Sequence, residues 1–268
     1  MNLLLIIGGI ILALESCLMY MYLHRKTHIS LSYLYKDNLI VIVMVYAIGY
    51  LLSDWLTGWS LLIAMGLVPV VGLLLTLIRF FRFPLRKPVK NEDAIVSPAD
   101  GNIIYIKKIE KGDVPMSTKE GVTATLHEFA NVELQYPCWI IGINMTPFDV
   151  HRNATPIAGT IIMNKHFDGK FLSLKDPKAI AQNERNTIVI DNGTHQVGVV
   201  QTASKLVKRI VTYKQAGEQV DQCEWFGMIK FGSQVDVIIP CDYEIAVELK
   251  QQVYTRKTIL ATLKKIII

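Results

Sequence analysis

The sequence predicts an α+β protein in which N-terminal transmembrane helices precede a β-rich domain. Two observations lead to this prediction. Three long apolar segments lie before residue 80, and short runs rich in Val, Ile and Thr fill the rest of the chain. The composition agrees, because 51% of the 268 residues are hydrophobic and only 19% are charged. That is too apolar for a disordered chain.

The apolar segments cover residues 3–22, 39–56 and 59–78. Each approaches the ~20 residues that a helix needs to cross a bilayer. The first segment lacks the basic start and small-residue cleavage site of a signal peptide. Residues 1–79 are therefore expected to form a membrane anchor with about three transmembrane helices.

The charge of the chain lies beside these segments. Residues 1–90 hold 8 Lys and Arg against 3 Asp and Glu, whereas residues 91–268 hold 20 of each kind. A nucleic-acid-binding protein would carry its positive charge on the folded body, so no nucleic-acid partner is expected. The basic residues follow the first and third segments, which places the body on the cytoplasmic face of a cell membrane, expected to be a bacterial inner membrane.

The remaining chain is expected to consist of a basic linker, residues 80–96, and a β-rich domain, residues 97–268. One helix is expected at about residues 177–185. Strands are expected in runs rich in β-branched residues between Gly, Pro, Asn and Asp, namely at 103–109, 139–145, 160–163, 187–191, 196–201, 207–213, 235–239 and 243–249.

The sequence gives no indication of a metal or nucleotide site. Cys17, Cys138, Cys223 and Cys241 are scattered without a close pair, which disfavours a zinc site or a disulfide framework. We expect them to be small buried apolar residues. Phosphate-binding and metal-binding motifs are also missing from the sequence, so no metal is predicted.

The most informative short motif is Gly232-Ser233 between two β-rich runs. Glycine lacks a Cβ, so its backbone can bend and leave its carbonyl open to attack. A base that removes the Ser233 proton would let Oγ attack this carbonyl and shift the acyl group from nitrogen to oxygen. Elimination of the ester would break the chain, and hydrolysis of the resulting dehydroalanine would leave a pyruvoyl group.

Two further motifs supply the other groups that such chemistry needs. Asp100 lies in the Pro/Gly turn SPADG, and His151 lies in the run DVHRN. A serine, a histidine and a carboxylate that holds the imidazole tautomer make a base-activated nucleophile.

Taken together, these motifs resemble the phosphatidylserine decarboxylase family, which is pyruvoyl-dependent. The resemblance covers about residues 80–263. It is carried, in order along the chain, by FFRFP (80–84), SPADG (97–101), PFDVHRN (147–153), GKFLSL (169–174), NERN (183–186) and GMIKFGSQVDVIIP (227–240).

The resemblance implies self-cleavage between Gly232 and Ser233. Residues 1–232 would become a β chain and residues 233–268 an α chain, which together form a heterodimer, with further oligomerisation left open. Asp100, His151 and Ser233 match the self-processing residues, and Ser233 would become the covalent pyruvoyl (pyruvate) cofactor. This group would decarboxylate phosphatidylserine to phosphatidylethanolamine through a Schiff base, with His151 as the candidate acid. The implied partners are the phospholipid substrate and a lipid bilayer.

This chain departs from the family at two positions. Longer bacterial members carry a second histidine where this chain has Ala154, so His151 serves both steps or another histidine, His166 or His195, assists. The family usually has Arg after the cleavage-site serine, where this chain has Gln234, which cannot pair a phosphate by charge.

If that arginine touches the lipid headgroup in the family, Arg152 or Arg185 is the candidate replacement here. Three alternatives to the main prediction stay open. They are a decarboxylase of another serine lipid such as archaetidylserine, a membrane-tethered serine hydrolase that uses the same three residues, and a non-enzymatic lipid-binding domain.

Overall fold

The structure is a computed structural model that divides into two compact units, Met1–Arg79 and Phe80–Ile268. Of the first unit it describes only single positions, so the three predicted transmembrane segments lie outside the described residues. The described residues are 43, 47, 71, 74, 78, 81–110, 116–117, 123–124, 136–146, 148–169, 182–203, 210–230 and 233–264.

The predicted α+β class with N-terminal transmembrane helices is wrong for the part of the chain that the structure describes. That part is built from β-strands, with helical conformation only at isolated positions, and no helix there is long and apolar enough to cross a membrane. Of the helix expected at 177–185, only the end is described, and Arg185 already opens a strand. The cause is the β-branched run of residues 187–190, which favours a strand.

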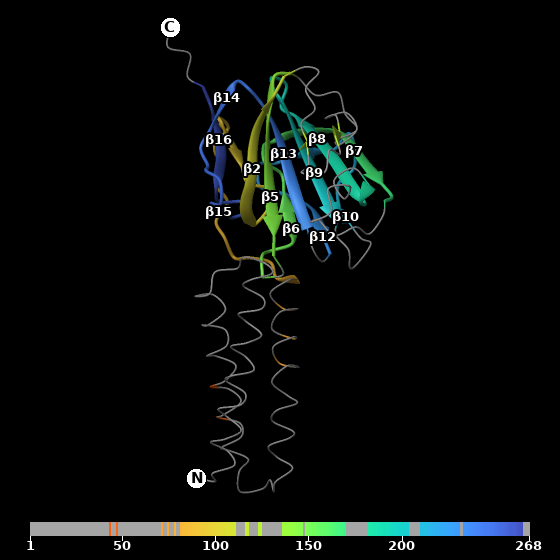
Figure 1. Cartoon of the computed structure of the whole chain (residues 1–268), viewed down its shortest axis with the longest axis vertical. Coiled ribbons are helices and arrows are strands. Elements are labelled where there is room, and N and C mark those ends of the chain that lie inside the picture. The colour runs from red at the N-terminus through yellow and green to blue at the C-terminus, as the bar shows by residue number, and fades with distance from the viewer. Residues whose placement is uncertain are drawn as a thin grey trace, which may run out of the picture. The chain divides into compact units, whose positions relative to one another are not determined.

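An eight-stranded antiparallel sheet forms the centre of the second unit (Figure 1). Neighbouring strands are mostly far apart in the sequence, so the sheet is held by long-range pairing. In spatial order its strands are β11 (Gln219–Val220), β7 (Gly159–Phe167), β8 (Arg185–Asp191), β9 (Gln196–Ala203), β13 (Ser233–Pro240), β5 (Cys138–Met145), β2 (Gly101–Ile109) and β15 (Gln252–Val253).

Smaller sheets complete the described fold. One lies beside β2 and β15 in Figure 1 and joins β1 (Ala94–Val96), β16 (Ile259–Leu263) and β14 (Tyr243–Ile245). A second joins β10 (Ile210–Thr212), β12 (Trp225–Ile229) and β6 (Arg152–Ala154). The third is the short hairpin of β3 (Met116–Ser117) and β4 (Thr123–Ala124).

The central sheet buries side chains on both faces. Along β13, Val235, Val237 and Ile239 belong to the larger apolar cluster, whereas Ile238 belongs to a smaller one with Ile140 of β5. Successive side chains of a strand point to opposite faces, so β13 is covered on both sides. This explains why the second half of the strand, residues 237–239, is continuously apolar.

Candidate active site

The described residues that flank two chain links lie side by side at one end of the central sheet. The link 146–151 connects β5 to β6 and ends at His151, and the link 230–232 connects β12 to β13 and precedes Ser233. β5 pairs with β13, and β6 pairs with β12, both antiparallel. Because the strands that flank the two links are paired, the fold brings the histidine link and the Gly-Ser link together.

Ser233 is the first residue of β13, in the middle of the sheet. Its Cα lies opposite Met145 of β5 on one side and Ala203 of β9 on the other. Met145 directly precedes the link that carries His151, and the backbone N–H of Ile229 donates to the His151 carbonyl at 3.0 Å. Gly232 and the side chain of Ser233 lie outside the described residues.

His151 is completely buried, and its tautomer follows from its hydrogen bond. Nδ1 lies 2.9 Å from the Asp149 carbonyl oxygen. A carbonyl only accepts, so Nδ1 carries the hydrogen and Nε2 carries the lone pair of a base. The pKa of His151 is lowered to about 3, mainly by burial; the hydrogen bond to the Asp149 carbonyl opposes this shift and the nearby Arg82 guanidinium adds to it. The imidazole is therefore neutral at physiological pH.

The carboxylate of Asp149 fixes the shape of the same link. Its Oδ2 accepts hydrogen bonds from the backbone N–H and the hydroxyl of Thr146, both at 2.7 Å, and Oδ1 accepts from Gln252 Nε2 at 3.1 Å. Burial raises the pKa of Asp149, and these hydrogen bonds oppose the shift. The Asp149 side chain thus links the two ends of the segment from Thr146 to Asp149, just before the histidine.

Asp100 is also buried, and it joins three segments. Arg86 binds it with two hydrogen bonds, Nη1 to Oδ1 at 2.6 Å and Nη2 to Oδ2 at 2.8 Å. The backbone N–H of Thr255 donates to Oδ1 at 2.8 Å, and that of Val150 donates to Oδ2 at 3.4 Å. Asp100 therefore holds the backbone one residue before His151, whereas the bond that sets the imidazole tautomer comes from the Asp149 carbonyl.

The two arginines predicted to bind substrate lie in different places. Arg152 directly follows His151, and its guanidinium lies 3.4 Å from the ring centroid of Phe83 and 3.3 Å from the Tyr213 hydroxyl. Arg185 opens β8, two strands away from β13, with its guanidinium 5.0 Å from the ring centroid of Phe167. Burial lowers the pKa of Arg185. Arg152 is the nearer of the two to the histidine in the chain.

The histidines considered as helpers lie away from Ser233. His195 is in the turn between β8 and β9, at the opposite end of β9 from Ala203, and its Nε2 lies 3.5 Å from Asp242 Oδ2. His166 is on β7, three strands from β13, with Nε2 3.3 Å from Glu184 Oε1. Of these histidines, the strand pairing brings only His151 next to the cleavage-site link.

Gln234 belongs to a buried polar cluster rather than to the histidine link. Its Nε2 donates to the Tyr105 hydroxyl at 3.0 Å and to the two Asp236 oxygens at 3.0 and 3.1 Å, and the Tyr105 hydroxyl donates to Asp236. Burial raises the pKa of Asp236 to about 7 and also raises the pKa of Tyr105. Gly142 makes room for this cluster, because a Cβ there would lie 2.5 Å from Tyr105 Cζ.

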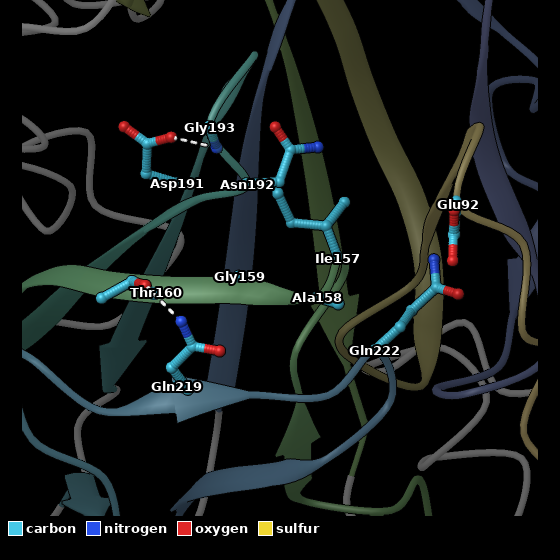
Figure 2. Close-up of a pocket in the computed structure, with 10 residues that line it drawn as sticks. All are labelled: Glu92, Ile157, Ala158, Gly159, Thr160, Asp191, Asn192, Gly193, Gln219 and Gln222. Atoms are coloured by element: carbon cyan, nitrogen blue, oxygen red, sulfur yellow. Dashed lines mark hydrogen bonds between the residues drawn. The ribbon is translucent and has the colours of Figure 1, made fainter.

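A solvent-open hollow of about 520 Å³ lies at the other end of the sheet (Figure 2). Figure 2 shows two hydrogen bonds beside it: the Gly193 N–H donates to the Asp191 carboxylate, and the Gln219 side-chain amide donates to the Thr160 hydroxyl. Asp191 ends β8, the strand that Arg185 opens. Seven strand residues span about 20 Å, so this hollow is separate from the meeting point of the two links.

Some of these contacts were not predicted from the sequence. Arg86 was assigned to the basic membrane flank, although it pairs with Asp100. Asp149 and Thr255 were not singled out at all. Their roles depend on contacts between segments far apart in the chain, for which no local pattern of the sequence gave an indication.

Comparison with known proteins identifies the family. A family model described as phosphatidylserine decarboxylase matches residues 73–261. A provisionally named archaetidylserine decarboxylase proenzyme of Methanocaldococcus jannaschii is 41% identical over 196 residues, 72% of this chain and 93% of its own length. The phosphatidylserine decarboxylase proenzyme of Cytophaga hutchinsonii is 31% identical over 242 residues, 90% of this chain and 98% of its own. That of Prosthecochloris aestuarii is 36% identical over 203 residues, 74% of this chain and 84% of its own.

The matches cover most of the chain, including both links of the candidate site. The chain therefore belongs to the phosphatidylserine decarboxylase family, and the resemblance carried by its motifs is confirmed.

Proposed function

We propose that this protein is a proenzyme that cuts itself between Gly232 and Ser233 and then decarboxylates the serine headgroup of phosphatidylserine. The observation that carries the proposal is the meeting of the histidine link with the Gly-Ser link at one end of the sheet. Family membership supports both the reaction and the self-processing, because the relatives are named as proenzymes.

His151 is suited to the first step. Its neutral imidazole, with the lone pair on Nε2, accepts the proton of the Ser233 hydroxyl as Oγ attacks the Gly232 carbonyl. The Asp149 carboxylate accepts from the Thr146 N–H and the Asp100 carboxylate accepts from the Val150 N–H, so both act as positioning groups for the link before His151. β-Elimination of the ester then releases the Gly232 carboxylate and leaves a dehydroalanine at position 233, and hydrolysis of that residue releases ammonia and leaves the pyruvoyl end of the new chain.

The fold supports a stable pair of fragments after cleavage. β13 to β16 all follow the cut, yet β13 pairs with β5 and β9, β15 pairs with β2, and β16 pairs with β1. Each of these pairs joins residues on opposite sides of the cut. The two fragments therefore stay together as a heterodimer without a peptide bond between them.

The second reaction depends on the processed serine. A pyruvoyl ketone condenses with amines and accepts the electrons released when a carboxylate leaves as CO2. The position proposed for such a group is consistent with this chemistry, because Ser233 begins a central strand opposite Met145, and the link that follows Met145 leads to the buried His151. His151 is the candidate that returns a proton to the product, and Arg152, next to it in the chain, is the candidate contact for the lipid phosphate.

A specific observation supports a second substrate. One relative, at 41% identity, is provisionally named an archaetidylserine decarboxylase proenzyme. Phosphatidylserine and archaetidylserine share the serine headgroup on which the chemistry acts, so the candidate site does not separate them. Assays of both lipids with the purified enzyme decide between the two substrates.

The decisive test is the mass of the purified protein. We expect two fragments, residues 1–232 and a blocked fragment that begins at position 233, and we expect hydroxylamine to react with the smaller one. Ser233→Ala should remain uncut and inactive, because it lacks the attacking oxygen. A matched control is Ser97→Ala. The Ser97 hydroxyl donates to the Ala99 carbonyl in the Asp100 turn, and the variant without it should still be cut.

The competing hydrolase function predicts a different result. A serine hydrolase would stay one continuous chain, and an acylating probe would label Ser233. An active and uncut protein would overturn the proposed self-processing.

A further inference from the structure

In the linker before β1, apolar side chains are exposed and arginine side chains are half-buried, the reverse of the usual arrangement. Phe81, Phe83 and Leu85 are exposed, with 41%, 59% and 105% of their surface accessible, whereas Arg82, between the two phenylalanines, and Arg86, after Leu85, are half-buried. In an ordinary surface segment the charged side chains face water and the apolar ones face the protein. We call the three exposed apolar side chains the linker strip.

The arginines of this segment reach into the candidate active site. Arg86 holds the Asp100 carboxylate, and Arg82 Nη1 donates to the Phe148 carbonyl at 3.3 Å, in the link that leads to His151. The same short segment therefore carries anchors to the site on one side and the linker strip on the other. This places the strip next to the site.

Aromatic rings and guanidinium groups continue the surface around the strip. Besides its contact with Arg152, the Phe83 ring packs edge-on against Trp225, with centroids 6.3 Å apart, and the Arg256 guanidinium lies 4.9 Å from the Trp225 ring centroid. Aromatic rings with polar edges and long cationic side chains suit a boundary between water and lipid.

The basic residues of the linker lie beside the strip, and the acidic residues Glu92 and Asp93 follow them. Between residues 81 and 91 the chain carries four basic residues and no acidic one, and Lys87 and Lys90 are exposed. Anionic phospholipid surfaces attract such basic groups, and exposed apolar side chains among them insert at the boundary of headgroups and acyl chains.

We propose that the linker strip enters the surface of an anionic phospholipid bilayer and holds the active site against the lipid headgroups. This inference rests on the proposed function, since it names the surface at which that enzyme meets its lipid substrate. It follows that the headgroup reaches the site while the acyl chains stay in the bilayer. Extraction of the acyl chains would expose them to water at high cost.

Fluorescence of an added tryptophan tests where the strip lies. The full chain carries Leu85→Trp, and the matched control carries Ile162→Trp, an exposed aliphatic position on β7 that is 47% accessible. Ile162 is a suitable control because it lies away from the candidate substrate residue Arg185. It is five residues, or about 16 Å along β7, from Phe167, the residue that pairs with Arg185. The emission of the four native tryptophans, measured in the parent, is subtracted.

We expect the signal of Trp at 85 to be quenched by acrylamide in buffer. With phosphatidylserine vesicles we expect quenching by brominated acyl chains instead, whereas Trp at 162 stays accessible to acrylamide throughout. Two results overturn the proposal. If Trp at 85 is already shielded from acrylamide without vesicles, residues 1–79 or a second copy of the chain cover the strip. If it stays accessible with vesicles, the strip does not enter lipid.

Activity gives an independent test with the processed enzyme. Leu85→Asp is compared with Ile162→Asp on phosphatidylserine in vesicles and on a short-chain phosphatidylserine dissolved as monomers. We expect the ratio of kcat/KM on vesicles to that on monomers to fall about tenfold for Leu85→Asp, the equivalent of ~1.4 kcal/mol. The ratio should not change for Ile162→Asp.

The two substrates also separate this inference from the proposed function. If the parent enzyme decarboxylates neither form, the proposed function fails. If it decarboxylates both and the ratio for Leu85→Asp is unchanged, the function stands and the role of the linker strip is wrong.

Discussion

Two buried carboxylates near the cleavage site have opposite surroundings. Asp100 receives a bidentate guanidinium and two backbone N–H groups, whereas Asp236 receives only the neutral donors of Tyr105 and Gln234. Burial raises the pKa of Asp236 to about 7. A buried carboxylate without a cationic partner pays a large desolvation penalty for its charge. The difference indicates that Asp100 is held in place by a guanidinium and backbone N–H groups, while the charge of Asp236 depends on pH.

The largest expected effect comes from removing the Asp100 anchor. Asp100→Ala leaves the Arg86 cation and two backbone N–H groups without their acceptor, which costs about 3–5 kcal/mol of unfolding free energy for a broken buried pair. It should also leave most of the protein uncut, because the backbone before His151 loses a contact. Urea unfolding in a Ser233→Ala background and the uncut fraction in the processing-competent protein measure the two effects.

A double variant separates charge from position. Asp100→Ala with Arg86→Met removes both partners and should recover part of the stability, since no buried charge is left alone. It should not recover cutting. Normal maturation of Asp100→Ala would remove this carboxylate from the site.

The Asp236 cluster is tested at Gly142. A Cβ at this position would lie 2.5 Å from Tyr105 Cζ, so Gly142→Ala must displace the ring that reaches Asp236. We expect a loss of about 1–3 kcal/mol, typical of overpacking. The control is the same substitution in a Tyr105→Ala background, where the ring is absent and the added cost should vanish. An equal cost in both backgrounds would contradict the packing that we describe.

Per pH unit, the smallest effect is a pH dependence of stability. Between pH ~4 and 7, native Asp236 keeps its proton while the unfolded chain has released it, because the folded pKa is raised from 3.8 to about 7. The unfolding free energy contributed by this group is therefore lost as pH rises through that window, by on the order of 1 kcal/mol per pKa unit. Asp236→Asn should have a flatter stability profile there than the parent, measured by urea unfolding of uncut protein.

Asp191 provides the opposite control. Hydrogen bonds from Gln196 and the Gly193 N–H lower the pKa of this exposed carboxylate. Its contribution is present above pH ~4 and lost only as pH falls further. Asp191→Asn should therefore keep the slope of the parent between pH 4 and 7. If Asp236→Asn also keeps that slope, Asp236 is not protonated in the native protein.

The sequence predicted the long strands of the sheet and the motifs of the site. β2, β5, β8, β9 and β13 contain dense β-branched alternation, which is a local property. The short strands β1, β6, β12 and β15 were missed, because their conformation is set by the partner strand rather than by their own composition. The expected strand at 243–249 ends at Ile245, and Lys250 has the positive φ of a turn.

The contacts around Asp100 and Asp236 illustrate the same limit. The motifs predicted Asp100, His151 and Ser233 as a group, and the strand pairing brings their segments to one end of the sheet. The pairing of Arg86 with Asp100, and that of Tyr105 with Asp236 across Gly142, depend on side chains from different strands and the linker. No local pattern encodes such a contact, because it exists only after the segments have assembled.

The position of β13 also implies that folding precedes the proposed self-cleavage. Both of its neighbours, β5 and β9, come earlier in the chain, so β13 can pair only when a nearly complete chain has assembled, and the proposed cut would follow that pairing. Misfolded copies would stay unbroken, and the appearance of the small fragment would report successful folding. Once broken, the chain has lost the covalent connection that guided β13 into place, so denatured mature enzyme should regain its structure far less readily than denatured precursor.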